Sequence, residues 1–333
     1  MRYKDSLECL DQLSERNESS TDIFQMLDEH GFGDGLPVGE LNEKTSASFV
    51  QASARSADDV VATIRPLRGM LTVRRLAAAA ALAGCLPEHM PLLIALGQAL
   101  EAPELNALGV LSTTSSAAYM VIVNGPARRN LHFNGSANCL GPGNRSNATV
   151  GRCLSLVTRM VGGAREGVAD MATQGQPAKY TFCFAENEEA SPWPPLHAER
   201  GVTAHRSAIT VMGVAGIVEA FEADSYEPGR MVESLATVLA YGAPVVRPGS
   251  GLIGGGHHAV VVSPEWADAF SRAGMAKIDV QRALLDASQL ERGGLRLAAA
   301  PEDILIVVAG GAGVKQNIVP GWAGGSAPVT SPL

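Results

Sequence analysis

The last third of the chain carries the pattern that most constrains its fold. An apolar run at residues 258–262 is followed by two helical segments at 264–273 and 280–290, and then by a second apolar run at 304–308. Strand, helix, helix and strand in this order form a crossover, because strands joined through helices run parallel in one sheet. We therefore predict an α/β protein with a mixed sheet and at least one parallel crossover.

Other segments fit this fold class. Four apolar segments are typical of buried strands: 109–111, 118–123, 180–185 and 208–218. Helices are expected from near Thr72 to Gly84, from near Glu88 to Glu101, at 144–161 and at 231–240. Ala-rich and Gly-rich stretches among them predict helices whose backbones pack closely. Asp22 is expected to cap a short helix that stops at Gly31, and the sequence shows no internal repeat.

Composition divides the chain into four parts. Residues 1–33 are polar and of mixed charge, which indicates an N-terminal helical arm, and residues 34–205 form an α/β portion with the densest polar stretch. Residues 206–320 form a second α/β portion. Residues 321–333 are rich in Gly, Ser and Pro and are expected to form an irregular tail.

Charge and cysteine content argue against several classes of protein. Hydrophobic residues make up 46% of the chain and charged residues 18%, which suffices for a core and is too little charge for a disordered chain. A net charge of −8 argues against nucleic acid as a partner. No secretory signal or membrane-spanning run is visible, and the five scattered cysteines match no disulfide framework. We expect a cytoplasmic protein with no membrane partner.

The polar stretch at 134–152 is the strongest candidate for a binding site. A Gly-Pro-Gly turn at 141–143 opens a predicted helix, whose N-terminus offers unpaired N–H groups and partial positive charge. An anion or a carbonyl oxygen is the expected ligand. The residues expected to bind it are Asn134, Asn144, Arg145, Asn147 and Arg152, with the hydroxyls of Thr113 and Thr114. The alternative is a capped helix after an elaborate turn, because asparagine is common in both.

Candidate proton carriers lie elsewhere. Glu186 follows the predicted strand at 180–185 and is a candidate general base, although acidic runs of this kind are often solvated loops. His257 and His258 begin a strand, so one of them is expected to face a pocket and the other to pack. Cys139 precedes the positive end of a helix, which lowers a thiol pKa, and is the candidate nucleophile.

The same side chains permit a metal site. His257, His258 and Glu188, with Glu186 or Cys183, are types that bind a divalent metal, but their spacing matches no standard motif. The cofactor requirement is therefore open, with a divalent metal as one possibility. A Gly-rich loop at 309–313 resembles a phosphate-binding turn only loosely, because no long helix is expected after it.

The chain also resembles an uncharacterised bacterial protein family. The shared segments start at Asp34 and span most of the chain: DGLPV at 34–38, NGP at 124–126, GPG to NAT at 141–149, and YTFC, ENEE and SPW within 180–193. The family looks like one kept beside small thiol or selenol proteins with a Gly-Ser-Cys motif, which implies a thiol partner protein. The resemblance implies no activity, cofactor or catalytic residue.

Four functions compete at this point. The first is a lyase or hydrolase for a small polar, anionic molecule, whose oxygen is held by Asn and Arg while Glu186 or His257 moves a proton. The second is a metal-dependent enzyme, and the third is a thiol-dependent redox enzyme using Cys139. The fourth is a non-catalytic binding subunit, with the Ala-rich helices at 72–101 as the interface of a homo-oligomer.

Overall fold

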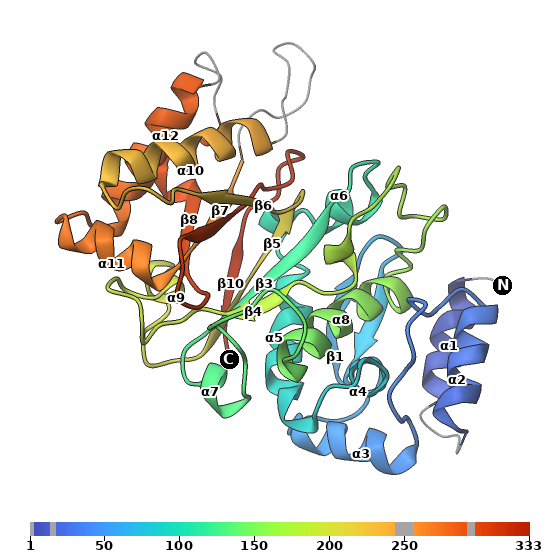
Figure 1. Cartoon of the computed structure of the whole chain (residues 1–333). Helices are drawn as coiled ribbons and strands as arrows, with labels where there is room; N and C mark the ends of the chain where they lie inside the picture. The colour runs from blue at the N-terminus through green and yellow to red at the C-terminus, as the bar shows by residue number, and fades with distance from the viewer. Residues whose placement is uncertain (1–2, 14–17, 244–255, 292–296) are drawn as a thin grey trace.

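Two mixed four-stranded sheets form the centre of the molecule (Figure 1). The computed structural model describes residues 3–13, 18–243, 256–291 and 297–333. The first sheet has the order β10-β5-β3-β4, and the second has the order β6-β9-β7-β8. The strands are β3 (Ala118–Asn124), β4 (Cys183–Ala185), β5 (Ala208–Val214), β6 (Val218–Phe221), β7 (His258–Val262), β8 (Ile304–Val308), β9 (Lys315–Val319) and β10 (Val329–Pro332). The predicted α/β fold is confirmed, and β7 and β8 form the expected parallel pair.

Alternating side chains of the central strands face two different cores. In β3, Met120 and Ile122 pack in an apolar layer that also contains Val261 of β7 and Val307 of β8, so the two sheets face each other. Val121, which lies between Met120 and Ile122 in the strand, faces a separate core on the outer side of the first sheet. Every residue of β3, β5, β7 and β8 is buried, which explains why these strands are apolar at most positions rather than alternating.

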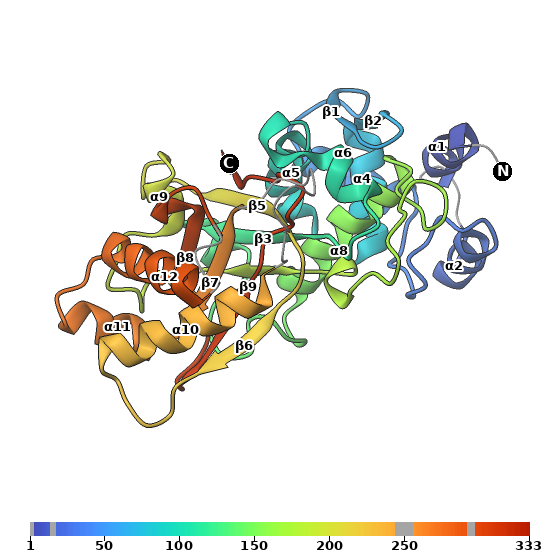
Figure 2. The same ribbon diagram turned by 90° about the horizontal axis from the view of Figure 1, so that it is seen from above.

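Helices cover the outer face of each sheet, which gives four layers (Figures 1 and 2). The first sheet is covered by α4 (Val73–Ala83), α5 (Met90–Ala99) and α8 (Arg145–Met160), and the second by α10 (Pro228–Gly242), α11 (Pro264–Arg272) and α12 (Lys277–Glu291). Peripheral elements are α1 (Tyr3–Leu13), α2 (Ser20–Glu29), α3 (Glu43–Ala52), α6 (Ala107–Ser112), α7 (Ala127–Asn130), α9 (Leu196–Glu199) and the β1–β2 pair (Val60–Ile64, Gly69–Thr72).

The two sheets exchange edge strands between two runs of the chain, β3 to β6 and β7 to β10. The first run contributes β6 to the second sheet, and the second run contributes β10 to the first sheet. After β5 the chain leaves the first sheet and forms β6 beside β9, and after β9 it returns to form β10 beside β5. The segment after β5 and the segment after β9 cross each other. At the crossing Ala215 N donates to Pro320 O at 2.8 Å, and Trp322 N donates to Gly213 O at 3.0 Å. Both sheets thus contain a parallel pair, an antiparallel third strand and an exchanged antiparallel edge, a repeat of structure that the sequence does not display.

Three local predictions are wrong. The segment 109–111 lies in helix α6, where Asn106 caps the first turn, so Thr113 and Thr114 follow a helix rather than a strand. The tail after Gly321 is not irregular, because residues 329–332 form β10. Ser19, not Asp22, caps α2: its hydroxyl accepts from Asp22 N, and Asp22 lies in the first turn. The helices predicted near Thr72 and Glu88 and at 144–161 and 231–240 are confirmed as α4, α5, α8 and α10.

The crossing predicts a strong effect of a small substitution. A Cβ at Gly321 would lie 1.7 Å from the carbonyl oxygen of His257, whereas a Cβ at Gly216, on the opposing segment, meets nothing within 4 Å. We expect Gly321→Ala to lower the free energy of unfolding by about 3 kcal/mol, because a backbone atom cannot move aside without shifting a strand. Urea unfolding of both variants measures this, with Gly216→Ala expected within ~1 kcal/mol of the wild type. Equal effects in the two variants would contradict the close crossing.

Candidate functional site

The carboxyl ends of the parallel pairs in the two sheets lie together. Asn187 N, just after β4, donates to Val308 O at the end of β8 over 2.7 Å, and Gly310 N donates to Gly135 O over 2.9 Å. These contacts bring the loop after β4, the Gly-rich loop after β8 and the turn at 134–140 into one place. Glycine is needed there, because a Cβ at Gly135 would lie 2.5 Å from the Ala185 carbonyl oxygen. The arrangement matches the position at which open α/β sheets bind ligands.

Five polar side chains, here called the carboxylate cluster, gather at this end of the first sheet: Asn124, Arg128, Glu186, Glu188 and His197. Asn124 is the last residue of β3, and Glu186 directly follows β4. Both fall on the face that looks toward the second sheet, because side chains alternate along a strand and Ile122 and Phe184 lie in the layer between the sheets. Asn124, Glu186 and His197 are completely buried.

The Asn124 amide binds both carboxylates of the cluster, and the Arg128 guanidinium binds the carboxylate of Glu188. Asn124 Nδ2 donates to Glu186 Oε2 at 2.5 Å and to Glu188 Oε1 at 2.9 Å. Arg128 donates through Nη1 to the Glu186 backbone carbonyl and through Nη2 to Glu188 Oε2, both at 3.0 Å. The same guanidinium also forms two 3.0 Å bonds with the half-exposed carboxylate of Glu189. Because three groups fix Arg128, the orientation of Glu188 is set before any ligand arrives.

His197 completes the cluster from helix α9. Its Nε2 lies 3.3 Å from the Ala204 carbonyl oxygen, which assigns the proton to Nε2 and leaves Nδ1 as an acceptor in the neutral ring. That Nδ1 is 4.0 Å from Glu188 Oε1, too far for a hydrogen bond. The preceding residue contributes its backbone, because Leu196 N donates to Glu186 Oε2 at 2.8 Å.

Unpaired polar atoms are concentrated in this cluster. Among the described residues, eight buried side-chain atoms lack a hydrogen-bond partner, and four of them are Asn124 Oδ1, Arg128 Nε, Glu186 Oε1 and His197 Nδ1. A buried polar atom without a partner costs about 1–3 kcal/mol, so a cluster with a purely structural role would be expected to pair them. Three of the four can accept a proton or a hydrogen bond, which suits the binding of a water or a substrate hydroxyl.

The burial of Glu186 changes its acidity. Desolvation raises the pKa of this carboxyl group to about 7, and it outweighs the opposing effects of the Lys277 ammonium and of the hydrogen bonds from Leu196 N and Asn124. The charge of Glu188 raises it further. A carboxyl group with a pKa near neutrality exists in both protonation states under ordinary conditions, as a general acid or base requires.

Cys139 lies close to the cluster but in a different environment. Its side chain is buried in the layer between the two sheets. Burial raises the pKa of the thiol to about 11, although the backbone N–H groups of Cys139, Gly310 and Leu140 favour the thiolate. The thiol form therefore dominates at neutral pH, which does not favour a nucleophilic role.

The asparagines of the polar stretch bind their own loop. Asn144 caps α8 through Asn147 N at 2.9 Å and donates to the His132 carbonyl oxygen at 2.8 Å. Asn147 accepts from Asn134 N and donates to the carbonyl oxygens of Asn134 and Cys139, at 2.9, 2.9 and 3.0 Å. Asn134 in turn accepts from Ser136 N and donates to the Ala137 carbonyl oxygen. These contacts fix the shape of the turn that packs against the loop after β8.

The two arginines of the stretch are also engaged by the protein. Arg145 donates to the Gly84 carbonyl oxygen at 3.0 Å. Arg152 forms a partly buried ion pair with Asp34 at 2.7 Å, next to bonds with two backbone carbonyl oxygens of the 36–37 segment. Their predicted role as oxygen-binding groups stays a prediction, and the contacts seen here attach α8 to the segment that precedes the body of the protein.

The two histidines lie far from the cluster. His257 and His258 are at the amino end of β7, whereas the cluster adjoins Val308 at the carboxyl end of the parallel neighbour β8. His257 Nε2 pairs with Asp303 at 3.1 Å, and His258 contacts the backbone at Leu297 O and Gly321 N. The structure therefore does not bring His257 or His258 together with Glu188, and no group of three or more metal-binding side chains gathers within the described ranges.

Thr113 and Thr114 are separate from the other candidates. The Thr113 hydroxyl accepts from Ser115 N at 3.1 Å, and the Thr114 carbonyl oxygen accepts from Thr173, so both organise the turn after α6. Sequence reasoning found Glu186 and Glu188, and it missed Arg128 and His197. The position of Asn124 at the carboxyl end of a buried strand could have marked it as a site residue. Nothing in the sequence around Arg128 indicated its contacts with residues about sixty positions away.

Comparisons with known proteins add no name to this site. No protein-family model matches the chain, and no curated protein is found as a relative. The resemblance noted from the sequence motifs therefore stays a prediction. In the described part of the chain, no helix has the length and apolar character needed to span a membrane.

The raised pKa of Glu186 predicts a pH-dependent stability. The folded protein binds this proton more tightly than the unfolded chain, so the contribution is complete below about pH 4.5 and is lost as the pH rises through about 7. Replacement by glutamine keeps the shape and removes the charge. We expect Glu186→Gln to gain up to about 3 kcal/mol relative to the wild type across this range, measured by urea unfolding at several pH values.

Glu189→Gln is the matched control for this experiment. Glu189 belongs to the same network, but the hydrogen bond from Arg128 lowers its pKa to about 2, so its own contribution changes only below the pH range of interest. Its stability curve should run parallel to that of the wild type between pH 5 and 7. A Glu186→Gln curve that is also parallel would show that Glu186 titrates normally.

Proposed function

We propose that this chain is an enzyme that transfers a proton to or from a small polar substrate, by lyase or hydrolase chemistry, with Glu186 as the acid–base group. The observation that carries the proposal is a completely buried carboxyl group with one unpaired oxygen and a pKa raised to about 7. Structural carboxylates are usually paired and have lowered pKa values, so this combination favours a catalytic role.

The geometry supports a division of labour within the cluster. Glu186 Oε2 is held by Asn124 and by Leu196 N, which leaves Oε1 to exchange the proton. As a carboxylate it accepts a proton from a water or from a substrate carbon, and as an acid it returns the proton to the leaving group. Asn124 Oδ1 and His197 Nδ1, both unpaired, supply acceptors for a hydroxyl or water held beside Glu186.

The path to solvent favours a small substrate. Glu188 is 15% exposed and Glu189 is 53% exposed, so the cluster approaches the surface through the loop that follows β4. The carboxylates of Glu188 and Glu189 on this path repel a strongly anionic substrate. A weakly charged or neutral substrate therefore fits better than the anionic one predicted from the sequence. Arg128 is already matched by two carboxylates and offers its unpaired Nε as the remaining donor.

The other sequence hypotheses find less support. A thiol-dependent reaction requires the Cys139 thiolate, which the raised pKa disfavours. A metal-dependent reaction requires ligands in one place, and His257 is paired with Asp303 instead. A homo-oligomer built through α4 and α5 would need exposed apolar surface on these helices, and most of their apolar residues are buried within the chain.

The proposal predicts the effect of substitutions on turnover. In a screen of small esters, amides and hydroxy acids, any substrate that the wild type converts should be converted about 10²–10⁴-fold more slowly by Glu186→Gln, because general acid–base catalysis contributes that factor. Glu199→Gln is the control, since Glu199 is also partly buried and also interacts with Lys277, at 3.0 Å, but lies outside the cluster. A Glu186→Gln variant with full turnover would rule out this role.

A further inference from the structure

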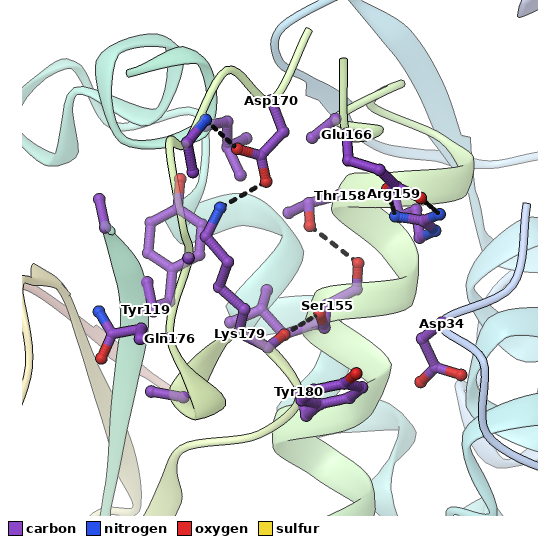
Figure 3. Close-up of a pocket in the computed structure, with 18 of the residues that line it drawn as sticks. Asp34, Tyr119, Ser155, Thr158, Arg159, Glu166, Asp170, Gln176, Lys179 and Tyr180 are labelled. Atoms are coloured by element: carbon purple, nitrogen blue, oxygen red, sulfur yellow. Dashed lines mark hydrogen bonds and ion pairs between the residues drawn. The ribbon is translucent and has the colours of Figure 1, made fainter. Parts of the chain in front are cut away.

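A cavity of about 520 Å³ lies at the opposite end of β3 from the carboxylate cluster. It is lined by the outer face of β3, by helix α8 and by the segments 28–35 and 164–182 (Figure 3). Tyr119, near the start of β3, lines it, whereas Asn124 ends the same strand. Tyr119 and Val121 of the lining lie on the outer face of β3, whereas Asn124 lies on the inner face, so the cavity is a separate feature. Its volume lies in the range of small-molecule sites.

Two buried donors that line this cavity have no partner. The Tyr119 hydroxyl and Arg159 Nε are both among the eight unpaired buried side-chain atoms of the described residues. Figure 3 shows Tyr119 on the β3 side and Arg159 on the α8 side of the cavity. Burial raises the pKa of Tyr119, so its hydroxyl keeps its proton and remains a donor. Two unpaired donors call for a ligand with acceptor atoms, and oxygen is the common choice.

Most of the charged side chains around the cavity are paired within the protein. Arg159 pairs with Glu166 through a 2.8 Å bond from Nη2 and a second bond from Nη1, and it holds the pKa of Glu166 at about 2. Lys179 pairs with Asp170, as the dashed line in Figure 3 marks. A ligand that carried its own charge would have to compete with these pairs, so a neutral molecule fits the site better.

The rest of the wall is mixed, with apolar side chains beside polar ones such as Ser155 and Gln174. Leu111, Leu154 and Phe182 contribute to the lining from α6, α8 and the segment before β4. Apolar surface with a few placed donors is the usual composition of a small-molecule site. The ligand therefore needs an apolar body in addition to an acceptor oxygen.

We propose that this cavity binds a small neutral carbonyl compound, such as an amide or a ketone with an apolar body, whose oxygen accepts from the Tyr119 hydroxyl. The proposal goes beyond the acid–base chemistry at Glu186 and does not depend on it. In the absence of ligand the Tyr119 hydroxyl is a buried donor without a partner, which destabilises the empty protein. The ligand removes this penalty by supplying the acceptor.

The first test uses the empty protein and does not require a ligand. Tyr119→Phe removes the unpaired hydroxyl without changing the ring, so we expect its Tm to rise by about 2 °C or more. Tyr180→Phe is the matched control, because this second tyrosine of the cavity is 50% exposed and its loss of a hydroxyl should leave Tm unchanged. A lower Tm for Tyr119→Phe would mean that the hydroxyl has a partner within the protein, and it would overturn the proposal.

The second test measures binding with defined probes. Benzamide, acetophenone and caprolactam are titrated by ligand-observed NMR against the wild type, Tyr119→Phe and Tyr180→Phe, with benzoate as the charged comparison. We expect at least one neutral probe to bind the wild type and Tyr180→Phe equally and to bind Tyr119→Phe about tenfold more weakly, the value of one hydrogen bond. Benzoate should bind more weakly than benzamide.

Two outcomes would overturn the assignment of ligand and site. The first is that no neutral probe shows binding that Tyr119→Phe weakens. The second is that benzoate binds more tightly than benzamide, which would make the site one for anions. Glu186→Gln should bind the probes as the wild type does, so a failure of the acid–base role and a failure of this site give different results.

Discussion

The apolar layer between the two sheets is the constraint on which the rest of the structure depends. Each central strand buries one set of side chains in this layer and the alternate set under helices, so neither sheet has a face left for solvent. Polar side chains on the strands can therefore approach the surface only at the strand ends. For this reason Asn124 and Glu186, on the inner face, come together where β3 and β4 end.

Burial at this point is costly, and the cluster offsets only part of the cost. Glu186 receives two hydrogen bonds at one oxygen, while the other oxygen receives none. Arg128 is matched by Glu188 and Glu189, which removes most of the penalty for its own burial. The atoms that remain unpaired are Asn124 Oδ1, Glu186 Oε1, His197 Nδ1 and Arg128 Nε. These unpaired atoms are the feature on which the proposed proton transfer rests.

The main elements of the fold could be predicted because their patterns are local. The strands at 258–262 and 304–308 and the helices between them follow from apolar runs and spacing alone. Segment 109–111 was assigned to a strand because a short apolar run has no distinctive period, and the Asn106 cap decided in favour of a helix. Strand β10 was missed because its residues Val329 to Pro332 are paired by a distant partner, β5, and not by their own sequence.

The candidate site could be predicted only in part for the same reason. Glu186 and Glu188 were recognisable as carboxylates after a strand. The contacts of Arg128, and the choice of Glu186 rather than Glu188 as the buried group, depend on how two sheets meet. The asparagines at 134, 144 and 147 are a different case: their density predicts a ligand site, and in the structure they hydrogen-bond to their own turn.

The exchanged edge strands have a consequence for how the molecule forms during synthesis. The first sheet contains strands from residues 118–214, yet its edge at β5 is completed only by residues 329–332, at the very end of the chain. While the chain is still attached to the ribosome, that edge has free N–H and C=O groups and is open to pairing with other strands. The early half therefore cannot complete its sheet until residues 329–332 have been synthesised and can pair with β5.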